Sequence, residues 1–486
     1  MGKISKDKRK FTQNIVYVGL CSIIMALQKV LLVPILTKTL GVQDYGAWTN
    51  IVNTAMLLGV ISSLGLGPTF IRLMSSERNK QTIRKSISLV FLILFISGTV
   101  FSFISFLLSD IVAILILKDI HYSFFIKLSS LLVLLEAGNL IAMSIYKGLK
   151  LFKSYTVIYI LHSLSEFLLI LSLLVFGLGF TGVILSTIFL KLLLVCGSLL
   201  VFKSKIGISF PDIKKISYFL KFGIHLILLP LYNWVIRVSD QYIIGFFLGP
   251  KMIGIYSLHY SLAYMLFNLT YVVIFVLAPI MTQYWEEQKL KKLRMYVSFS
   301  YKYLAMILIP SIIGYVVLYE GIIRNFSTAE FLASNILLMI LSISVIFGTL
   351  HLIFQNLLLL FKKTRIINYI MLSGALLNIF LNILIVPYFG INGAAFSTLF
   401  TFIILVLLDF IFLNKLYKFD FMPGTLLKFT IAGLIMGIGI SYYPSISLLS
   451  ILLKVFAGTL FYFIFIYMLK GITKSEIKFF ISFYKK

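Results

Sequence analysis

The sequence predicts an all-α integral membrane protein with about 14 transmembrane helices. Of its 486 residues, 60% are hydrophobic and only 12% are charged, whereas soluble proteins carry about 25% charged residues. A membrane-spanning helix needs roughly 20 mostly apolar residues, so the hydrophobic share supplies about 14 of them. The mean hydropathy of +1.05 agrees. A soluble globular chain and a disordered chain are both excluded.

Apolar segments follow one another along the whole chain, with no polar stretch long enough for a soluble domain. The basic stretch MGKISKDKRK precedes the first segment, which is too long for a signal-peptide core and is interpreted as an uncleaved span. The predicted spans are 12–37, 47–70, 87–109, 123–145, 155–176, 180–201, 222–248, 254–282, 301–320, 331–358, 366–388, 391–413, 425–442 and 448–469.

Lysine and arginine concentrate on one side of the membrane in this arrangement. Of 43 such residues, 34 lie on the side of the N-terminus, 5 on the opposite side and 4 within spans. Basic residues favour cytoplasmic loops, which predicts that both termini are cytoplasmic and that the protein lies in the cell membrane. The net charge of +27 resides on that face. It predicts anionic membrane lipids, and no nucleic acid, as partners.

Known catalytic and metal-binding patterns do not fit the chain. Cys21 and Cys196 lie in apolar stretches and offer neither a disulfide framework nor metal-ligand spacing. Residues 177–182, GLGFTG, satisfy G-x-G-x-x-G but join two apolar spans, so no dinucleotide site is expected. We therefore expect no enzymatic activity, no catalytic residues, no metal site and no bound cofactor.

An internal repeat organises the sequence. LGVQDYGAW at 40–48 matches LGPKMIGIY at 248–256 with an offset of 208, LFK at 151–153 matches 360–362 with an offset of 209, and GFTGVILST at 179–187 matches GINGAAFST at 390–398 with an offset of 211. Each copy holds six spans, an even number, so the two copies have the same orientation. Parallel repeats of this kind are typical of transporters that bind substrate between their halves.

The repeat predicts the domain organisation. An N-terminal six-helix bundle covers 1–203, a cytoplasmic linker covers 204–221, and a C-terminal six-helix bundle covers 222–414. Two additional helices and a basic tail follow at 415–486.

Two cations inside the predicted spans are related by the repeat. Lys29 and Arg237 are separated by 208 residues, and each precedes an aligned glycine by twelve. Charged residues at this depth are costly and usually face a cavity or a partner. If the halves face each other across a cleft, both cations can bind one anion, especially a phosphate or diphosphate. Alternatively, Arg237 pairs with Asp240 on the same helix face, and Lys29 pairs with an acid of another helix or extends to the surface.

Further polar residues are candidates for the same cavity or for ion coupling. Span seven reads LYNWVIRVSDQY at 231–242 after Pro230, which favours either a broken helix lining a wet cavity or a kinked, buried one. Asp409 is expected to be hydrated near the cytoplasmic end of its span. The candidates are Gln28, Glu136, Glu166, Lys191, Asn233 and Asp240. Glu136, Glu166 and Lys191 could form either a purely structural ion-paired network or a site that couples to sodium ions or protons.

The chain resembles the polysaccharide-exporting branch of the multidrug/oligosaccharidyl-lipid/polysaccharide exporter superfamily. The stretches VLLVPILTKTLGVQDYGAW and SDQYIIGFFLGPKMIGIYSLHYSLAY carry the resemblance, which extends over the whole chain in length, span number and duplication. The matching positions are Pro34, Leu40, Gly41, Asp44, Tyr45, Gly46, Asp240, Gly245, Gly249, Gly254 and Tyr256.

The resemblance implies two six-helix bundles around a central cavity, with two C-terminal helices added. It implies a flippase that moves undecaprenyl-diphosphate-linked oligosaccharide units by alternating access, for surface polysaccharides such as O-antigen or capsule. Polysaccharide polymerase and glycosyltransferases are the implied protein partners. Lipid II flippases usually carry more cavity arginines, which argues mildly against lipid II as the substrate.

Two other functions remain open from the sequence. A cation-coupled multidrug exporter of the same fold would rely on acids rather than cations in its cavity. A membrane enzyme of glycan assembly, such as a polymerase or ligase, would need a large external loop, and the predicted external loops here are short.

Overall fold

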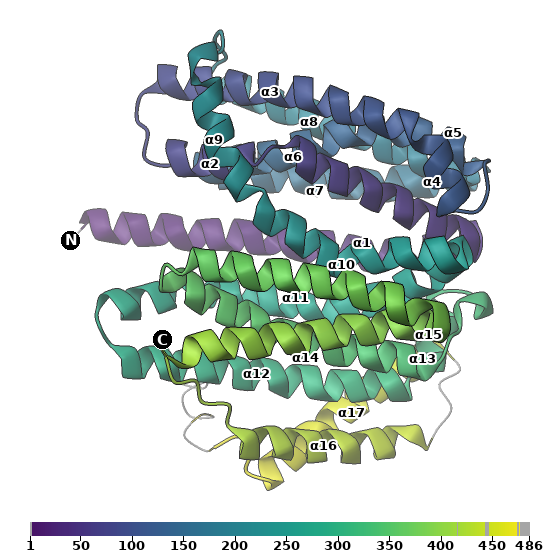
Figure 1. The fold of residues 1–486 in the computed structure, drawn as a ribbon. Coiled ribbons are helices and arrows are strands. Elements are labelled where there is room, and N and C mark those ends of the chain that lie inside the picture. The colour runs from purple at the N-terminus through teal and green to yellow at the C-terminus, as the bar shows by residue number, and fades with distance from the viewer. Residues whose placement is uncertain (1, 416, 443–446, 474–475, 477–486) are drawn as a thin grey trace. The chain divides into compact units, whose positions relative to one another are not determined.

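The computed structural model describes residues 2–415, 417–442, 447–473 and 476, and these residues form helices without any β-strand. Eleven of the described helical segments are long and apolar enough to cross a membrane (Figure 1). The chain is therefore an all-α, multi-pass membrane protein, as the composition predicts. Helices satisfy every backbone hydrogen bond internally, which hydrocarbon surroundings require.

The helices follow the order of the predicted spans. The first compact part of the chain contains α1 (Gly2–Ser62), α2 (Leu66–Met74), α3 (Lys80–Leu107), α4 (Ser109–Leu115), α5 (Tyr122–Ser129), α6 (Leu131–Gly148), α7 (Phe152–Val175), α8 (Gly179–Lys205), α9 (Ile216–Leu226) and α10 (Leu228–Leu248). The remainder contains α11 (Pro250–Glu286), α12 (Leu290–Val317), α13 (Tyr319–Phe326), α14 (Asn335–Leu360), α15 (Thr364–Asn414), α16 (Pro423–Ser441) and α17 (Leu448–Met468). Two short 3-10 helices, η1 (Ile213–Lys215) and η2 (Ala329–Phe331), lie in connections.

Two of the long segments are each a pair of helices joined at a glycine. Helix α1 breaks at Gly41, and α15 breaks at Gly390, where φ is 58°. These breaks lie between the predicted spans 12–37 and 47–70 and between 366–388 and 391–413. Helix α11, at 37 residues, corresponds to the predicted span 254–282. The count of fourteen itself stays a prediction.

The backbone repeats along with the sequence. Gly41 has φ 75° and ψ 178°, and Gly249, its partner at an offset of 208, has φ 82° and ψ −178°. This region of φ and ψ is essentially restricted to glycine. Helices α3 and α12, which lie at equivalent places in the two copies, are both 28 residues long. The equal backbone geometry supports the predicted duplication.

One of the three sequence matches does not align equivalent structure. Helix α6 ends just before Lys150 (φ 57°) and α14 ends just before Lys362 (φ 58°), so this turn is repeated at an offset of 212. The LFK match at an offset of 209 is therefore out of register by three residues. The turn after α6 and α14, rather than the shared letters, marks the equivalent positions.

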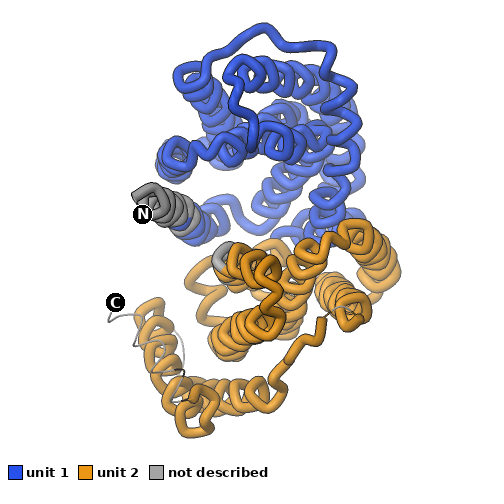
Figure 2. The backbone as a smooth tube through the Cα atoms, turned by 90° about the vertical axis from the view of Figure 1, so that its left-hand side faces the viewer, with its two compact units in different colours: residues 1–254 blue, residues 255–486 orange. Residues whose placement is uncertain are grey.

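The chain divides by packing into two compact units, residues 1–254 and 255–486 (Figure 2). This division lies 51 residues beyond the end of the predicted N-terminal bundle at 203, because α9 and α10 pack within the first unit. The predicted domain boundaries rest on the sequence duplication rather than on packing, so they remain a prediction.

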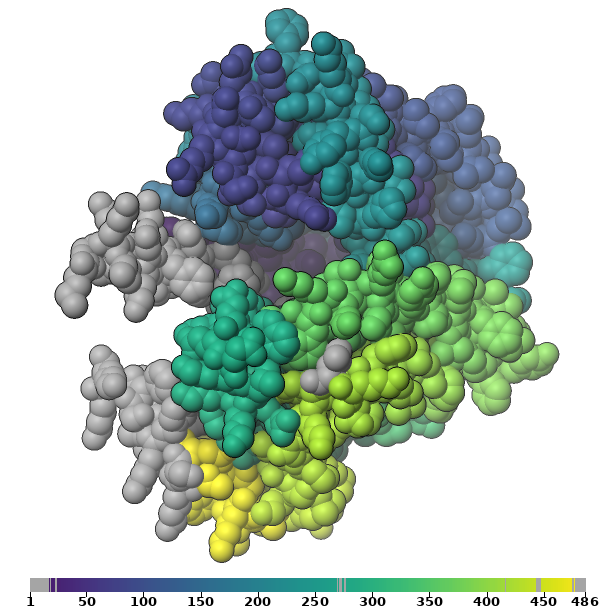
Figure 3. All heavy atoms as spheres, turned by 60° about the vertical axis from the view of Figure 1, so that its left-hand side comes forward, coloured from purple at the N-terminus to yellow at the C-terminus, as the bar shows by residue number. Residues whose placement is uncertain are grey.

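In the first unit, helices pack around the central helix α6. It contacts α1, α2, α3 and α8, and its buried face carries Ala137, Ile141 and Tyr146. The atoms of α9 lie against those of α2 (Figure 3). Within this contact, the Arg72 guanidinium of α2 lies 5.3 Å from the centre of the Phe222 ring of α9. The buried face of α6 thus carries both small and large apolar side chains, and it forms part of one apolar core with its neighbours.

In the second unit, α14 packs along α15, while α12 contacts both α14 and α16. The two C-terminal helices α16 and α17 pack on each other around Phe429 and Tyr462. Beyond the end of α17, Glu476 accepts a hydrogen bond at 2.6 Å from the Lys302 ammonium of α12. Burial alone would raise the pKa of Glu476, but the bonds from Lys302 and Thr473 lower it below its usual value.

We predict that Gly249→Ala destabilises the protein by about 1–3 kcal/mol, because alanine cannot occupy this backbone region without strain. The measurement is thermal or steric-trap unfolding of the purified protein. Gly314→Ala is the matched control, because no atom lies within 4 Å of the added methyl group and alanine favours helix by up to about 1 kcal/mol. Equal stability of the two variants would contradict the role assigned to the Gly249 backbone.

Candidate functional site

The three charged residues predicted on spans four, five and six do come together in the first unit. The ammonium nitrogen of Lys191, on α8, lies 2.9 Å from Oε1 of Glu136, on α6. Their side chains are only 17% and 8% exposed. A buried ion pair of this kind is costly to form, and removing one partner leaves an uncompensated charge. We call Glu136, Glu166 and Lys191 the acid–lysine network.

The third member of the network connects it to α1. Oε2 of Glu166, on α7, accepts a hydrogen bond at 3.2 Å from the Gln28 amide of α1. Among the described residues, Glu166 makes no ion pair within 4.0 Å. Gln28 directly precedes Lys29 in the sequence, so this hydrogen bond brings Glu166 to the turn of α1 that carries the first of the two repeat-related cations.

Three neighbouring polar residues were not predicted as part of this network. The Tyr159 hydroxyl donates to Oδ1 of Asn139 at 2.5 Å, and the Asn139 amide lies 3.5 Å from Oε2 of Glu136. Nε2 of His162 is buried and has no hydrogen-bond partner among the described residues. Tyr159, His162 and Glu166 are spaced by three and four residues on α7, so helical periodicity places them on one face. That spacing was the sequence signal that could have identified them.

The repeat-related cations have different surroundings. Lys29 is exposed on α1, next to the buried Gln28, and Arg237 is half-buried on α10. Asp240 is fully buried and accepts a hydrogen bond from the backbone N–H of Gln241 at 2.9 Å. Asn233 is exposed, and its amide donates to the Leu229 carbonyl of its own helix. The roles of these residues in binding stay predictions.

Side chains of α1 and α10 are joined by two hydrogen bonds that the sequence did not indicate. The Asn53 amide donates to Oε1 of Gln241 at 2.8 Å. The hydroxyl groups of Thr54 and Tyr242 lie 2.6 Å apart. The residues of each pair are 188 apart in the sequence, whereas the repeat offset is 208, so no sequence comparison aligns them.

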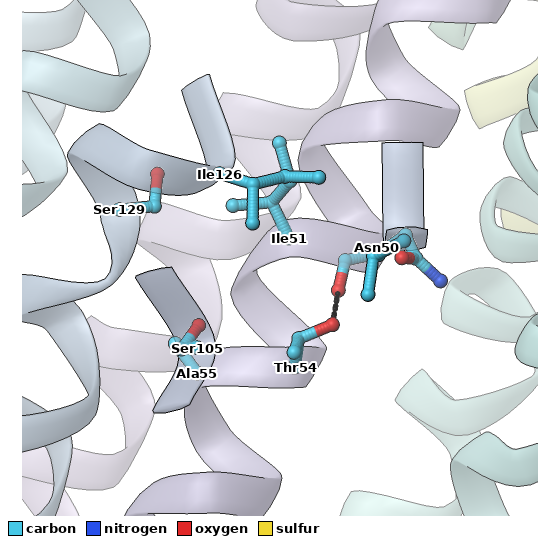
Figure 4. A pocket seen from close by; sticks show the side chains of 8 residues that line it. Asn50, Ile51, Thr54, Ala55, Ser105, Ile126 and Ser129 are labelled. Atoms are coloured by element: carbon cyan, nitrogen blue, oxygen red, sulfur yellow. Dashed lines mark hydrogen bonds between the residues drawn. The ribbon is translucent and has the colours of Figure 1, made fainter. Parts of the chain in front are cut away.

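A small pocket with both polar and apolar lining lies beside this α1–α10 contact. Asn50, Thr54, Ser105 and Ser129 line it together with Ile51, Ala55, Val112 and Ile126 (Figure 4). Asn50 is completely buried, and neither its amide nitrogen nor its amide oxygen has a hydrogen-bond partner among the described residues. An unpaired buried amide costs about 1–3 kcal/mol.

The structure corrects the expectation that Asp409 is hydrated. Asp409 is only 1% exposed, and its carboxylate lies 2.6 Å from Nδ1 of His351. Sequence reasoning missed His351 because it lies 58 residues away on another helix. Among the residues that the structure describes, no group of three or more His, Cys, Asp and Glu side chains could hold a metal ion.

The fold defines the chain as a multi-pass, all-helical membrane protein with an ion pair buried among its helices. A profile of the family described as polysaccharide biosynthesis protein matches residues 35–336, more than half of the chain. The chain belongs to this family. The match confirms the resemblance to the polysaccharide-exporting branch of the superfamily that the glycine-rich motifs suggest.

Two curated relatives match part of the chain. An uncharacterized membrane protein of Methanocaldococcus jannaschii is 29% identical over 211 residues, covering 43% of this chain and 41% of the relative. A protein named probable low-salt glycan biosynthesis flippase Agl15, from Haloferax volcanii, is 23% identical over 230 residues, covering 47% and 48%. The chain thus matches less than half of the length of each relative.

Solved structures share the fold at low sequence identity. The inward closed conformation of the lipid II flippase MurJ superposes with a TM-score of 0.75 at 18% identity, covering 93% of this chain and 98% of that one. An inward-facing multidrug resistance transporter of the MATE family gives a TM-score of 0.68 at 12% identity, covering 83% and 97%. These likenesses establish the fold that the motifs implied.

We predict that Lys191→Met destabilises the protein by about 3–5 kcal/mol, because Glu136 keeps a buried charge without its partner. The double variant Glu136→Gln with Lys191→Met should recover most of this loss. Unfolding of the purified protein measures both.

Lys127→Ala provides the control. Lys127 lies 2.9 Å from Asp110, the same distance, but the side chains are 36% and 54% exposed. Exposed ion pairs contribute little, so stability should hardly change. If the Lys191 and Lys127 variants lost equal stability, burial of the Lys191–Glu136 pair would not be what makes it important.

Proposed function

We propose that this protein is a flippase that moves undecaprenyl-diphosphate-linked oligosaccharide units across the cytoplasmic membrane for the synthesis of surface polysaccharides. Its membership of the polysaccharide biosynthesis protein family supports the proposal. The names of the relative Agl15 and of the structural neighbour MurJ both describe flippases.

The observation that carries the proposal is the pair of repeat-related cations. Lys29 and Arg237 each lie twelve residues before a glycine with the same unusual backbone conformation. Twelve helical residues span roughly 18 Å, so both cations lie deep within a membrane core about 30 Å thick. They would bind the diphosphate by charge-assisted hydrogen bonds, while the prenyl chain stays in lipid.

The acid–lysine network gives Lys29 a defined setting. The Gln28 amide donates a hydrogen bond to Glu166, and this bond attaches to α7 the turn of α1 that carries Lys29. Glu136 is already neutralised by Lys191. If sodium ions or protons drive the cycle, Glu166 is the acid of the network that we propose to take part, because its hydrogen-bond partner is a neutral amide.

The proposed orientation places both termini in the cytoplasm. Basic residues favour that side, and the excess of lysine and arginine lies on the loops that share the side of the N-terminus. The proposed partners are membrane lipids, the lipid-linked glycan and, in the cell, the polymerase and glycosyltransferases that use and make it.

We predict that Lys29→Ala combined with Arg237→Ala abolishes export of the glycan and lowers affinity for a diphosphate lipid by about 10²-fold or more. Each lost charged hydrogen bond is worth about 1.5–3 kcal/mol, and 1.4 kcal/mol is tenfold in affinity. Complementation of a deletion strain measures export, with lipid-linked glycan expected to accumulate in the inner leaflet.

Lys38→Ala is the matched control, because Lys38 is an exposed cation on the same helix as Lys29. It should leave export unchanged. Normal export in the double variant would rule out the diphosphate site. Accumulation of unpolymerised glycan in the outer leaflet of the deletion strain would instead point to a polymerase or ligase.

A further inference from the structure

Four positions of the repeat motif form a symmetric backbone contact. A Cβ atom on Gly46 would collide with the carbonyl oxygen of Pro250, and a Cβ atom on Gly254 would collide with the carbonyl oxygen of Val42. Val42 and Pro250, like Gly46 and Gly254, are related by the repeat offset of 208. Each copy of the motif thus supplies one glycine and one carbonyl group. We call this contact the outer glycine junction.

Side chains continue this junction toward the middle of the membrane. The Asn53–Gln241 and Thr54–Tyr242 hydrogen bonds join α1 to α10 about two helical turns further along. Asn50 lies between these bonds and Gly46 and is completely buried. The part of α1 that follows Gly41 is therefore held in two ways. Its outer end makes backbone contact with Pro250 and Gly254, and its next two turns are hydrogen-bonded to α10.

A second backbone contact joins the connection between α1 and α2 to helix α9. A Cβ atom on Gly223 would collide with the carbonyl oxygen of Leu64, and one on Gly65 would collide with the carbonyl oxygen of Gly223. The Arg72–Phe222 contact lies beside it. We call this the inner glycine junction. Gly46 and Gly65 are 19 residues apart, roughly 28 Å along a helix and close to the thickness of the membrane core.

We propose that the two glycine junctions are the alternating seals of the transport path, one at each face of the membrane. This inference rests on the proposed flippase function and assigns its conformational change to particular residues. Lys29 and Arg237 lie at depths between the two junctions. A substrate held by them can leave toward one face only if the junction on that face separates. Because each seal is a contact between backbones, a single methyl group is enough to prevent it from closing.

Weakening the outer seal and weakening the inner seal should change the labelling of one reporter cysteine in opposite directions. In a chain carrying Cys21→Ser and Cys196→Ser, Asn50→Cys places the single thiol behind the outer junction. The Asn50 side chain that it replaces makes no hydrogen bond to the described residues. A membrane-impermeant maleimide is added to intact spheroplasts. Gly254→Ala should raise the labelling rate about tenfold, because overpacking costs about 1–3 kcal/mol and 1.4 kcal/mol is tenfold in population. Gly223→Ala should lower it, because a chain that cannot seal the inner face keeps the outer face shut.

Gly314→Ala is the control and should label at the parent rate, since its added methyl group meets no atom within 4 Å. If Gly254→Ala does not fold, Gly46→Ala presents the same collision from the other copy of the motif and should give the same increase. Unchanged labelling in the Gly254 and Gly223 variants, or a change in the same direction in both, would overturn the proposal.

The experiment is independent of the substrate. Labelling is measured without added lipid, so a failure of the flippase assignment leaves its outcome intact. Conversely, unaltered labelling combined with lost export in the Lys29 and Arg237 double variant would reject the seals and keep the proposed function.

Discussion

Hydrocarbon offers no hydrogen-bond partner to a peptide group, and this constraint shapes everything else in the molecule. Backbone N–H and C=O groups are therefore satisfied within helices, and the chain changes direction where a residue tolerates an unusual backbone. Gly41 and Gly390 are such places inside α1 and α15, and Gly249 is one between α10 and α11. The same lack of a side chain allows backbones to touch at Gly46 and Gly254. Both these changes in chain direction and these backbone contacts thus depend on glycine.

The sequence predicts the class of fold well because its determinants are local or periodic. Hydrophobic segments, basic loops and a repeated motif are each visible without knowing what packs on what. The division into packing units was not visible, because it depends on where α9 and α10 dock. The LFK match failed for a related reason: three letters can coincide by chance, whereas the turn that ends α6 and α14 is defined by backbone angles.

For the candidate site, the sequence identified charges and missed their partners. Glu136, Glu166 and Lys191 are conspicuous because charges are rare in apolar segments, and the structure brings Glu136 and Lys191 into contact. Neutral polar residues such as Asn139, Tyr159 and Gln241 are not singled out by charge in a sequence, although they make the hydrogen bonds between helices. Asp409 is a further example. Its position near the end of a span suggested contact with water, but its carboxylate contacts His351, 58 residues away in the sequence.

The placement of α10 has a consequence for shortened forms of the protein. The predicted duplication assigns α10 to the second copy, but by packing it belongs with residues 1–254. A fragment that ends at residue 203 would lack the α10 side chains that bond Asn53 and Thr54 of α1. The N-terminal packing unit is therefore longer than the copy that the repeat predicts.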